Sequence, residues 1–217
     1  MIIRFKYCKK NEAKYLSHLD MLRILSRSIA RAGIKAALSR GFNPKPRITL
    51  SNPIPLGVQS LAEYADVEVD VCLDTGYFMK VINSCLPENI IVLDAACTCN
   101  KLKSLMSVID VVLYEFIIEA ADNMSLDKIK SFIDAYDSSS IYSFFTQAQQ
   151  KKIFLLKIYG YAKIFNNNSN RIFKFNDFNK ALKQFGQSNG LHIKDSSKTA
   201  VFIIKGARLA DPFEEVV

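Results

Sequence analysis

Apolar and polar residues alternate through residues 1–10, MIIRFKYCKK, and this period of two predicts a β-strand with one buried face. Through residues 15–33 the apolar residues recur at helical spacing instead, and Gly33 follows the last of them as a stop signal. Ser17 and Asp20 have the spacing of a capping box. We therefore expect a helix that begins just after Ser17 and ends before Gly33.

The same reading extends to the rest of the chain. It predicts extended segments or strands at 34–39, 47–58, 64–73, 89–98, 108–120 and 199–209. It predicts helices at 76–86, 125–137 and 176–186, and a long hairpin at 151–175 with the Asn-rich run 166–170 at its tip. The carboxylates of the segment EYADVEVD are expected on the solvent side of a half-buried sheet.

Each half of this series is close to β-α-β-β-α-β, the order of the ferredoxin-like fold. We therefore predict the α+β class, with two tandem ferredoxin-like halves at 1–102 and 103–217.

The length of 217 residues and the hydrophobic content of 49% suit two compact domains with real cores. No apolar run approaches the roughly 18 residues that a membrane span needs, and the N-terminus has no signal-peptide pattern. We expect a cytoplasmic protein without a membrane partner. The five cysteines are irregularly spaced, which favours ordinary thiols and no metal site.

The net charge of +8 is unevenly distributed, because residues 1–50 and 151–217 are basic and the middle of the chain is acidic. This asymmetry favours a polyanionic partner, with nucleic acid ahead of a membrane surface. Arg23, Arg27 and Arg31 fall on one stripe of the predicted helix. Forked guanidinium groups suit phosphate contacts; a solvated face and a face that binds a partner protein are the alternatives.

The stretch SRGFNPKPRITL, residues 39–50, combines Gly41 and two prolines with the cations Arg40, Lys45 and Arg47. Proline fixes φ and biases the preceding residue toward extended geometry. We expect a stiff, extended arm that holds its cations outward, while Phe42 either stacks on a base or pins the loop to the core. A rigid loop with incidental charge is the alternative.

His18 shares a helical line with apolar residues, so it is either a first-turn histidine in the core or a site residue close to Tyr15 and the Gly/Pro stretch.

The motifs in this region resemble the radical SAM-associated (radical SAM-linked) protein family, a domain of unknown function. The resemblance rests on Tyr15 to Asp20, Ser39 to Pro44, Pro53 to Gly57 and Glu63 to Asp66. It implies an accessory to a separate radical SAM enzyme. That partner would hold the iron–sulfur cluster, S-adenosylmethionine and cobalamin, because this chain has no CxxxCxxC motif and needs no cofactor of its own.

Three functions stay open. The first is a non-catalytic module that binds RNA through Arg23, Arg27, Arg31, Arg40, Phe42, Lys45 and Arg47 and presents it to the radical SAM enzyme. The second is a metal-independent endoribonuclease like the CRISPR repeat-processing enzymes. It would use His18 as general acid or base, Tyr15 as helper, and Lys45 or Arg47 to stabilise the charged transition state. The third is a protein-interaction scaffold for the radical SAM partner. The oligomeric state is not predicted.

Overall fold

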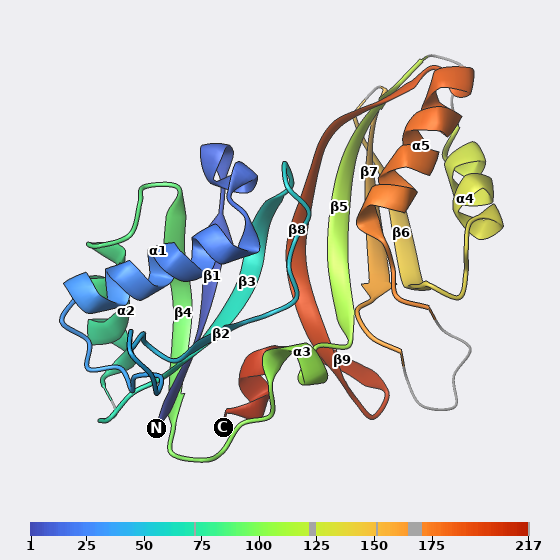
Figure 1. Cartoon of the computed structure of the whole chain (residues 1–217). Coiled ribbons are helices and arrows are strands. Elements are labelled where there is room, and N and C mark those ends of the chain that lie inside the picture. The colour runs from blue at the N-terminus through green and yellow to red at the C-terminus, as the bar shows by residue number, and fades with distance from the viewer. Residues whose placement is uncertain (72, 122–124, 151, 165–170, 217) are drawn as a thin grey trace. The chain divides into compact units, whose positions relative to one another are not determined.

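The computed structural model describes residues 1–71, 73–121, 125–150, 152–164 and 171–216. The chain forms two compact units (Figure 1): unit 1 is Met1–Ile109 with Ile203–Val217, and unit 2 is Asp110–Phe202. This division differs from the predicted boundary after residue 102, since the C-terminal residues group with the first unit. The predicted Asn-rich tip, 166–170, lies outside the described residues.

Unit 1 carries an antiparallel sheet in the order β4-β1-β3, with β2 paired to β3. Its first elements in chain order are β1 (Ile2–Lys9), the 3-10 helix η1 (Asn11–Tyr15), α1 (His18–Arg31), β2 (Ile48–Leu50), β3 (Gln59–Glu68), α2 (Thr75–Asn83) and β4 (Ile90–Thr98). They are followed by α3 (Leu105–Val108) and, at the C-terminus, by β9 (Arg208–Ala210) and the 3-10 helix η2 (Pro212–Glu215).

Unit 2 carries an antiparallel sheet in the order β8-β5-β7-β6. Its elements are β5 (Val111–Ala120), α4 (Leu126–Ala135), β6 (Ile141–Gln150), β7 (Ile153–Tyr161), α5 (Phe175–Asn189) and β8 (Leu191–Lys205). The protein is thus a mixed α and β structure built on antiparallel strands.

The structure differs from the predicted elements at residues 34–39 and around the hairpin of unit 2. Residues 34–39 form only isolated bridges, in which Ala36 pairs with Val69 and Leu38 with Pro46. The segment 141–150 is the full strand β6, which was not predicted. The hairpin therefore lies earlier than predicted, because β7 turns back onto β6 rather than onto residues that follow it.

The helices cover one face of each sheet. In unit 1 the core joins α1 residues such as Leu25 and Ile29 to Phe5 of β1, Val67 of β3 and Phe78 of α2, all fully buried. In unit 2 Phe116 of β5 packs against Phe175 and Phe178 of α5, with ring centroids 5.5 and 5.4 Å apart. Each core follows the apolar periodicity of its strands and helices.

The N-terminus of α1 is fixed by the capping box that the sequence predicts. The Asp20 amide donates to Ser17 Oγ at 3.2 Å, and the Ser17 amide donates to Asp20 Oδ2 at 3.3 Å. The hydrogen bonds from Ser17 hold the pKa of Asp20 below its ordinary value. Helix α1 therefore begins at a fixed residue, which places the side chains of its first turns.

We expect Ser17→Ala to lower the free energy of unfolding by about 1 kcal/mol, because the Asp20 amide at the helix start loses its acceptor. In wild type the stabilisation from the Asp20 carboxylate is complete above the ordinary pKa of a carboxyl group and is lost as the pH falls through the lowered pKa of Asp20. Urea unfolding at pH 7 measures the difference. Ser125→Ala is the matched control, because Ser125 at the start of α4 makes no side-chain cap hydrogen bond; an equal loss in both variants would contradict this role.

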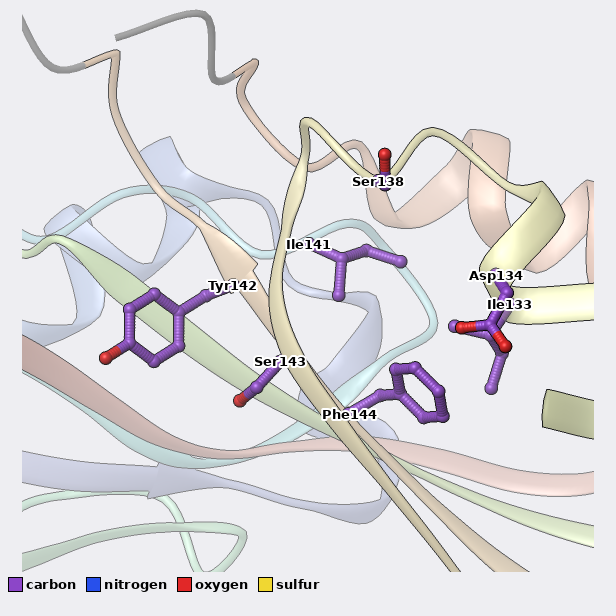
Figure 2. Close-up of a pocket in the computed structure, with 7 residues that line it drawn as sticks. All are labelled: Ile133, Asp134, Ser138, Ile141, Tyr142, Ser143 and Phe144. Carbon is purple, nitrogen blue, oxygen red and sulfur yellow. The ribbon is translucent and has the colours of Figure 1, made fainter.

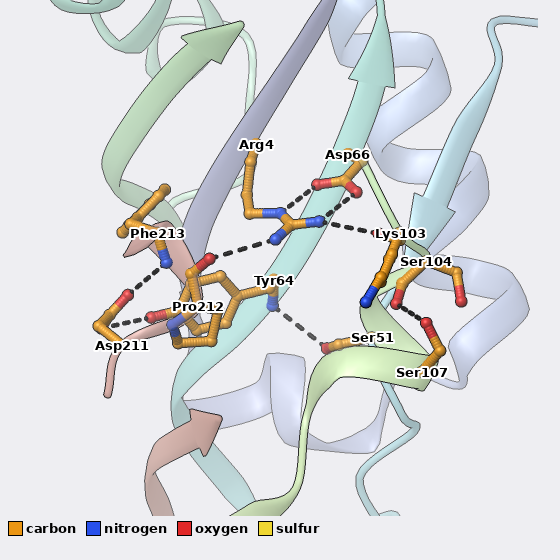
Figure 3. Close-up of polar contacts among 10 residues, drawn as sticks. All are labelled: Arg4, Ser51, Tyr64, Asp66, Lys103, Ser104, Ser107, Asp211, Pro212 and Phe213. Atoms are coloured by element: carbon orange, nitrogen blue, oxygen red, sulfur yellow. Dashed lines mark hydrogen bonds and ion pairs between the residues drawn. The ribbon is translucent and has the colours of Figure 1, made fainter. Parts of the chain in front are cut away.

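Two acidic residues of β3, Glu63 and Asp66, are buried, so the predicted solvent side is wrong for them, whereas Glu68 is about half exposed. Asp66 and Glu63 are 8% and 5% exposed. The fully buried Arg4 of β1 donates to both Asp66 carboxylate oxygens, Nε at 2.8 Å and Nη2 at 2.9 Å (Figure 3). Alternation places the polar residues on one face of a strand and the apolar residues on the other. In β3 the polar face is buried as well at Glu63 and Asp66.

Arg4 also binds two backbone carbonyls of unit 1. Its Nη1 donates to the Pro212 carbonyl at 3.2 Å and its Nη2 to the Lys103 carbonyl at 3.3 Å (Figure 3). Beside it, the Tyr64 hydroxyl donates to Asp211 Oδ2 at 3.0 Å. This network attaches the C-terminal residues to β1 and β3, which explains why they belong to unit 1.

Cys8, Cys85 and Cys99 are free thiols, whereas Cys97 forms a disulfide, which the cysteine spacing did not predict. Among the described residues, no helix has the length and apolar character to cross a membrane.

Candidate nucleic-acid interface

A groove of about 450 Å³ runs between α1 and the Gly/Pro loop, residues 39–47. The cations Arg23 and Arg27 of α1 and Lys45 of the loop line it. The rest of its lining consists of Leu19, Leu22, Ser26, Pro46 and Ile48. Three cations from two elements thus share one cavity with an apolar floor and no lining carboxylate. The apolar part of the lining was not predicted, because in the sequence its residues look like ordinary positions of a helix or a strand.

The Gly/Pro loop is closed rather than an extended arm. The Ser39 amide donates to the Lys45 carbonyl at 2.8 Å, and the Lys45 amide donates to Ser39 Oγ at 3.1 Å. The Arg47 amide donates to the Ala37 carbonyl at 2.8 Å, and Gly41 has a φ of +131°, which favours glycine. These bonds hold the two ends of the loop together and fix the position of Lys45.

Two of the predicted cationic contacts have protein partners instead. Arg31 Nη2 donates to the Cys85 carbonyl at 2.7 Å and to Ser28 Oγ at 3.2 Å, so it binds the chain just beyond α2. Arg47 Nη1 lies 2.7 Å from Glu68 Oε2 in a half-exposed ion pair. The predicted stripe of three arginines on α1 is therefore reduced to Arg23 and Arg27 in the groove.

The other cations remain open to solvent. Arg27, Arg40 and Lys45 are exposed and have no ion-pair partner among the described residues. Arg23 lies 3.2 Å from Asp20, with both side chains exposed, and exposed pairs of this kind are weak. Four cations of α1 and the Gly/Pro loop are thus available to an anion.

Phe42 is the most exposed aromatic residue of the described chain, at 112% of its reference area. Its ring does not pin the loop to the core, which removes one of the two roles that the sequence leaves open. A fully exposed phenyl ring on a closed loop can stack on a nucleic-acid base.

His18 lies at the rim of a different, much smaller cavity of about 10 Å³. Tyr7, Lys9 and Glu63 line this cavity with it, and the Lys9 Nζ donates to the Leu16 carbonyl at 2.9 Å. Burial and the charge of Glu63 raise the pKa of Tyr7 well above its ordinary value. The buried Lys9 and Glu63 were not predicted as site residues. Both lie on strands with alternating polar and apolar residues, and this alternation is the sequence signal that could have indicated them.

Tyr15 is 65% exposed and does not line the small cavity with His18. The centroid of its ring lies 5.2 Å from Lys14 Nζ. Its Cε1 atom lies beside Gly57, 3.8 Å from the position that a Cβ would take if a larger residue replaced this glycine. The two residues that the sequence pairs as catalytic are thus not joined in one cavity, and Lys45 lines the groove rather than the small cavity. Within the described ranges, no group of three or more His, Cys, Asp or Glu side chains could hold a metal ion.

A family model matches residues 3–154, which include the groove, the Gly/Pro loop and the Arg4 network's strands. Its description is "Uncharacterized protein conserved in bacteria (DUF2344)". The chain belongs to this family. The match runs from the second residue of β1 to the start of β7 and extends well beyond the motifs of the first 70 residues, so both units contain family sequence.

No curated protein matches the chain. Among solved structures, a chain of the archaeal box H/ACA sRNP Nop10–Cbf5 complex matches with a TM-score of 0.46 at 8% identity, over 90% of this chain and 46% of that one. An H/ACA RNP bound to a substrate RNA gives 0.44 at 7%, over 90% and 47%. An unknown protein from Galdieria sulphuraria gives 0.25 at 12%, over 91% and 96%. This chain spans about half the length of the first two.

Proposed function

We propose that unit 1 is a non-catalytic module that binds single-stranded RNA in the groove between α1 and the Gly/Pro loop. The carrying observation is that Arg23, Arg27 and Lys45 line one apolar-floored groove without a carboxylate. Phosphates bind the cations at the rim, while the apolar floor accepts the face of an unstacked base or a ribose. Arg40 adds a fourth phosphate contact, and Phe42 stacks on a neighbouring base.

The geometry favours a single strand over a duplex. In A-form RNA the bases are stacked inside the helix, so a duplex offers an apolar floor no base face. Guanidinium groups suit phosphate because they donate in a fork. Arg31 and Arg47 are left out of the proposed contact set, since their guanidinium groups already bind Cys85 and Glu68.

The salt dependence of binding tests this proposal in wild-type protein. With four phosphate contacts to a single strand, raising salt from 50 to 200 mM is expected to weaken the affinity about fiftyfold. Fluorescence anisotropy of a labelled unstructured oligouridine, in EDTA, measures it, and a duplex of equal length is the comparison. Undetectable binding, or an affinity that does not respond to salt, would remove the proposal.

The same samples test the nuclease alternative. A non-catalytic module leaves the oligonucleotide intact on a denaturing gel after prolonged incubation. Cleavage in EDTA that disappears in His18→Ala would assign the activity to His18 and replace the proposed function by that of a metal-independent endoribonuclease.

We also propose that the bound RNA is presented to a separate radical SAM enzyme of the cytoplasm, which holds the iron–sulfur cluster, S-adenosylmethionine and cobalamin. Support comes from the motif Tyr15 to Asp20 and its resemblance to radical SAM-linked proteins. Stable co-purification of this chain with the radical SAM enzyme tests the partnership, and its absence at micromolar concentration would argue against it.

We propose in addition that each unit is ferredoxin-like. Both units have the element order β-α-β-β-α-β, and when the four strands of each unit are numbered along the chain, both sheets have the strand order 4-1-3-2.

A further inference from the structure

Strand β6 forms one edge of the unit 2 sheet, and its sequence lacks the charges and prolines that protect many edges. Its single neighbour in the described sheet is β7. Residues 141–150, IYSFFTQAQQ, contain no charged residue and no proline. Natural edge strands are normally blunted by lysine, proline, inward charges or bulges, because an open edge pairs with other chains. The pairing of β6 with β7 has two register shifts, but β6 has no charge and no proline. Tyr142 and Phe145 add exposed aromatic surface, at 38% and 50%.

A groove of about 400 Å³ lies beside this edge, between β6 and α4. Figure 2 shows Ile141 and Phe144 pointing toward Ile133 and Asp134 of α4, while Tyr142 points to the other side of β6. The pairing register with β7 shifts between Ile141 and Ser143. This bulge explains why residues three apart share a side. The groove therefore has apolar walls and one exposed carboxylate, that of Asp134.

We infer that the β6 edge and this groove bind an extended basic segment of a partner protein by strand addition. The open backbone of β6 supplies the pairing, and the groove receives alternate apolar side chains of the added strand. Asp134 selects a lysine or arginine on the same face of the added strand, two residues from an apolar side chain, since no cation lines the groove. A second copy of β6 is a poorer occupant, because residues 141–150 offer no cation to Asp134.

This surface is separate from the RNA groove, which lies on other elements and carries the opposite charge. The proposal therefore does not depend on the proposed RNA function. The whole chain is basic, with a net charge of +8, so nonspecific attraction alone favours acidic peptides. A preference for a basic peptide would have to come from a local acidic site.

The test uses the full chain and fluorescein-labelled, end-blocked nonapeptides with valine at the even and threonine at the odd positions. The valine at position 4 is replaced by lysine or by glutamate, so that the charge lies on the valine face of the strand. We expect the lysine peptide to bind wild type, and one central proline in it to abolish binding, because proline cannot pair along a strand. Asp134→Lys is expected to weaken the lysine peptide about tenfold and to strengthen the glutamate peptide. Asp127→Lys is the matched control: it lies on the same helix, is exposed, and does not line the groove, so it leaves both affinities unchanged.

Three results would overturn the inference. One is equal binding of both peptides to wild type, and another is an equal effect of the two substitutions. The third is a dimer in light scattering that Phe145→Lys dissociates, which would assign the edge to a second copy of the chain. Unchanged circular dichroism of Asp134→Lys shows that a loss of binding does not come from unfolding.

Discussion

Asp66→Ala is expected to lower the free energy of unfolding of unit 1 by about 3–5 kcal/mol, because it leaves the buried charge of Arg4 without its partner. Arg4 is 0% exposed and meets the Asp66 carboxylate through two hydrogen bonds of 2.8 and 2.9 Å. A guanidinium group that cannot reach water depends on this pairing. Its other bonds, to the carbonyls of Pro212 and Lys103, carry no neutralising charge.

Urea unfolding followed by circular dichroism measures the loss. Glu68→Ala is the matched control, since it removes the same kind of ion pair two residues further along β3. That pair with Arg47 is about half exposed, so its removal is expected to cost less than about 1 kcal/mol. Arg4→Met combined with Asp66→Leu should recover much of the loss, because no charge is then left buried. Equal costs for Asp66→Ala and Glu68→Ala would contradict the role given to Arg4.

Phe42→Ala is expected to weaken the affinity for single-stranded RNA by about five- to a hundredfold, since stacking contributes about 1–3 kcal/mol per base. The ring is fully exposed, so its removal takes no packing from the core. The same substitution should therefore leave the urea midpoint unchanged. Anisotropy with labelled oligouridine measures the affinity, and the unfolding curve separates lost stacking from lost structure.

Phe42→Tyr is expected to keep most of the affinity, because it retains an aromatic face. Tyr77→Ala is the matched control, as Tyr77 is another exposed aromatic residue of unit 1, at 55%, on α2 and outside the RNA groove. A similar loss of affinity in Phe42→Ala and Tyr77→Ala would show that the effect is not stacking at the Gly/Pro loop.

Hydrophobic periodicity predicts the elements that have one buried and one exposed face. Helix α1 is the clearest case, since its capping residue, its apolar stripe and its end all have local signals. Strand β6 has none of them. As an edge strand it buries no residue fully on either side among those whose burial is described, so no alternation marks it, and the prediction shifted the hairpin toward residues 151–175.

Charged residues show the same limit for the site. Arg23 and Arg27 lie on one face of a helix, which their spacing in the sequence predicts, and both line the groove. Arg31 continues that spacing but binds the Cys85 carbonyl, a contact that depends on where α2 ends in space. Asp66 alternates as a solvent residue would, yet Arg4 on the neighbouring strand buries it. Only the three-dimensional pairing of strands decides between these outcomes.

The groove itself is tested most directly by removing its cations together. The groove variant combines Arg23→Ala, Arg27→Ala and Lys45→Ala. The matched control removes the same charge from exposed lysines of unit 1 outside the groove, with Lys10→Ala, Lys80→Ala and Lys101→Ala. The groove variant is predicted to lose most RNA affinity at 50 mM salt and to retain about a threefold response to 200 mM, as for one phosphate contact. The control should keep the affinity and the steep response of wild type. Equal losses in both variants, or wild-type affinity in the groove variant, would contradict the assignment of this groove to RNA.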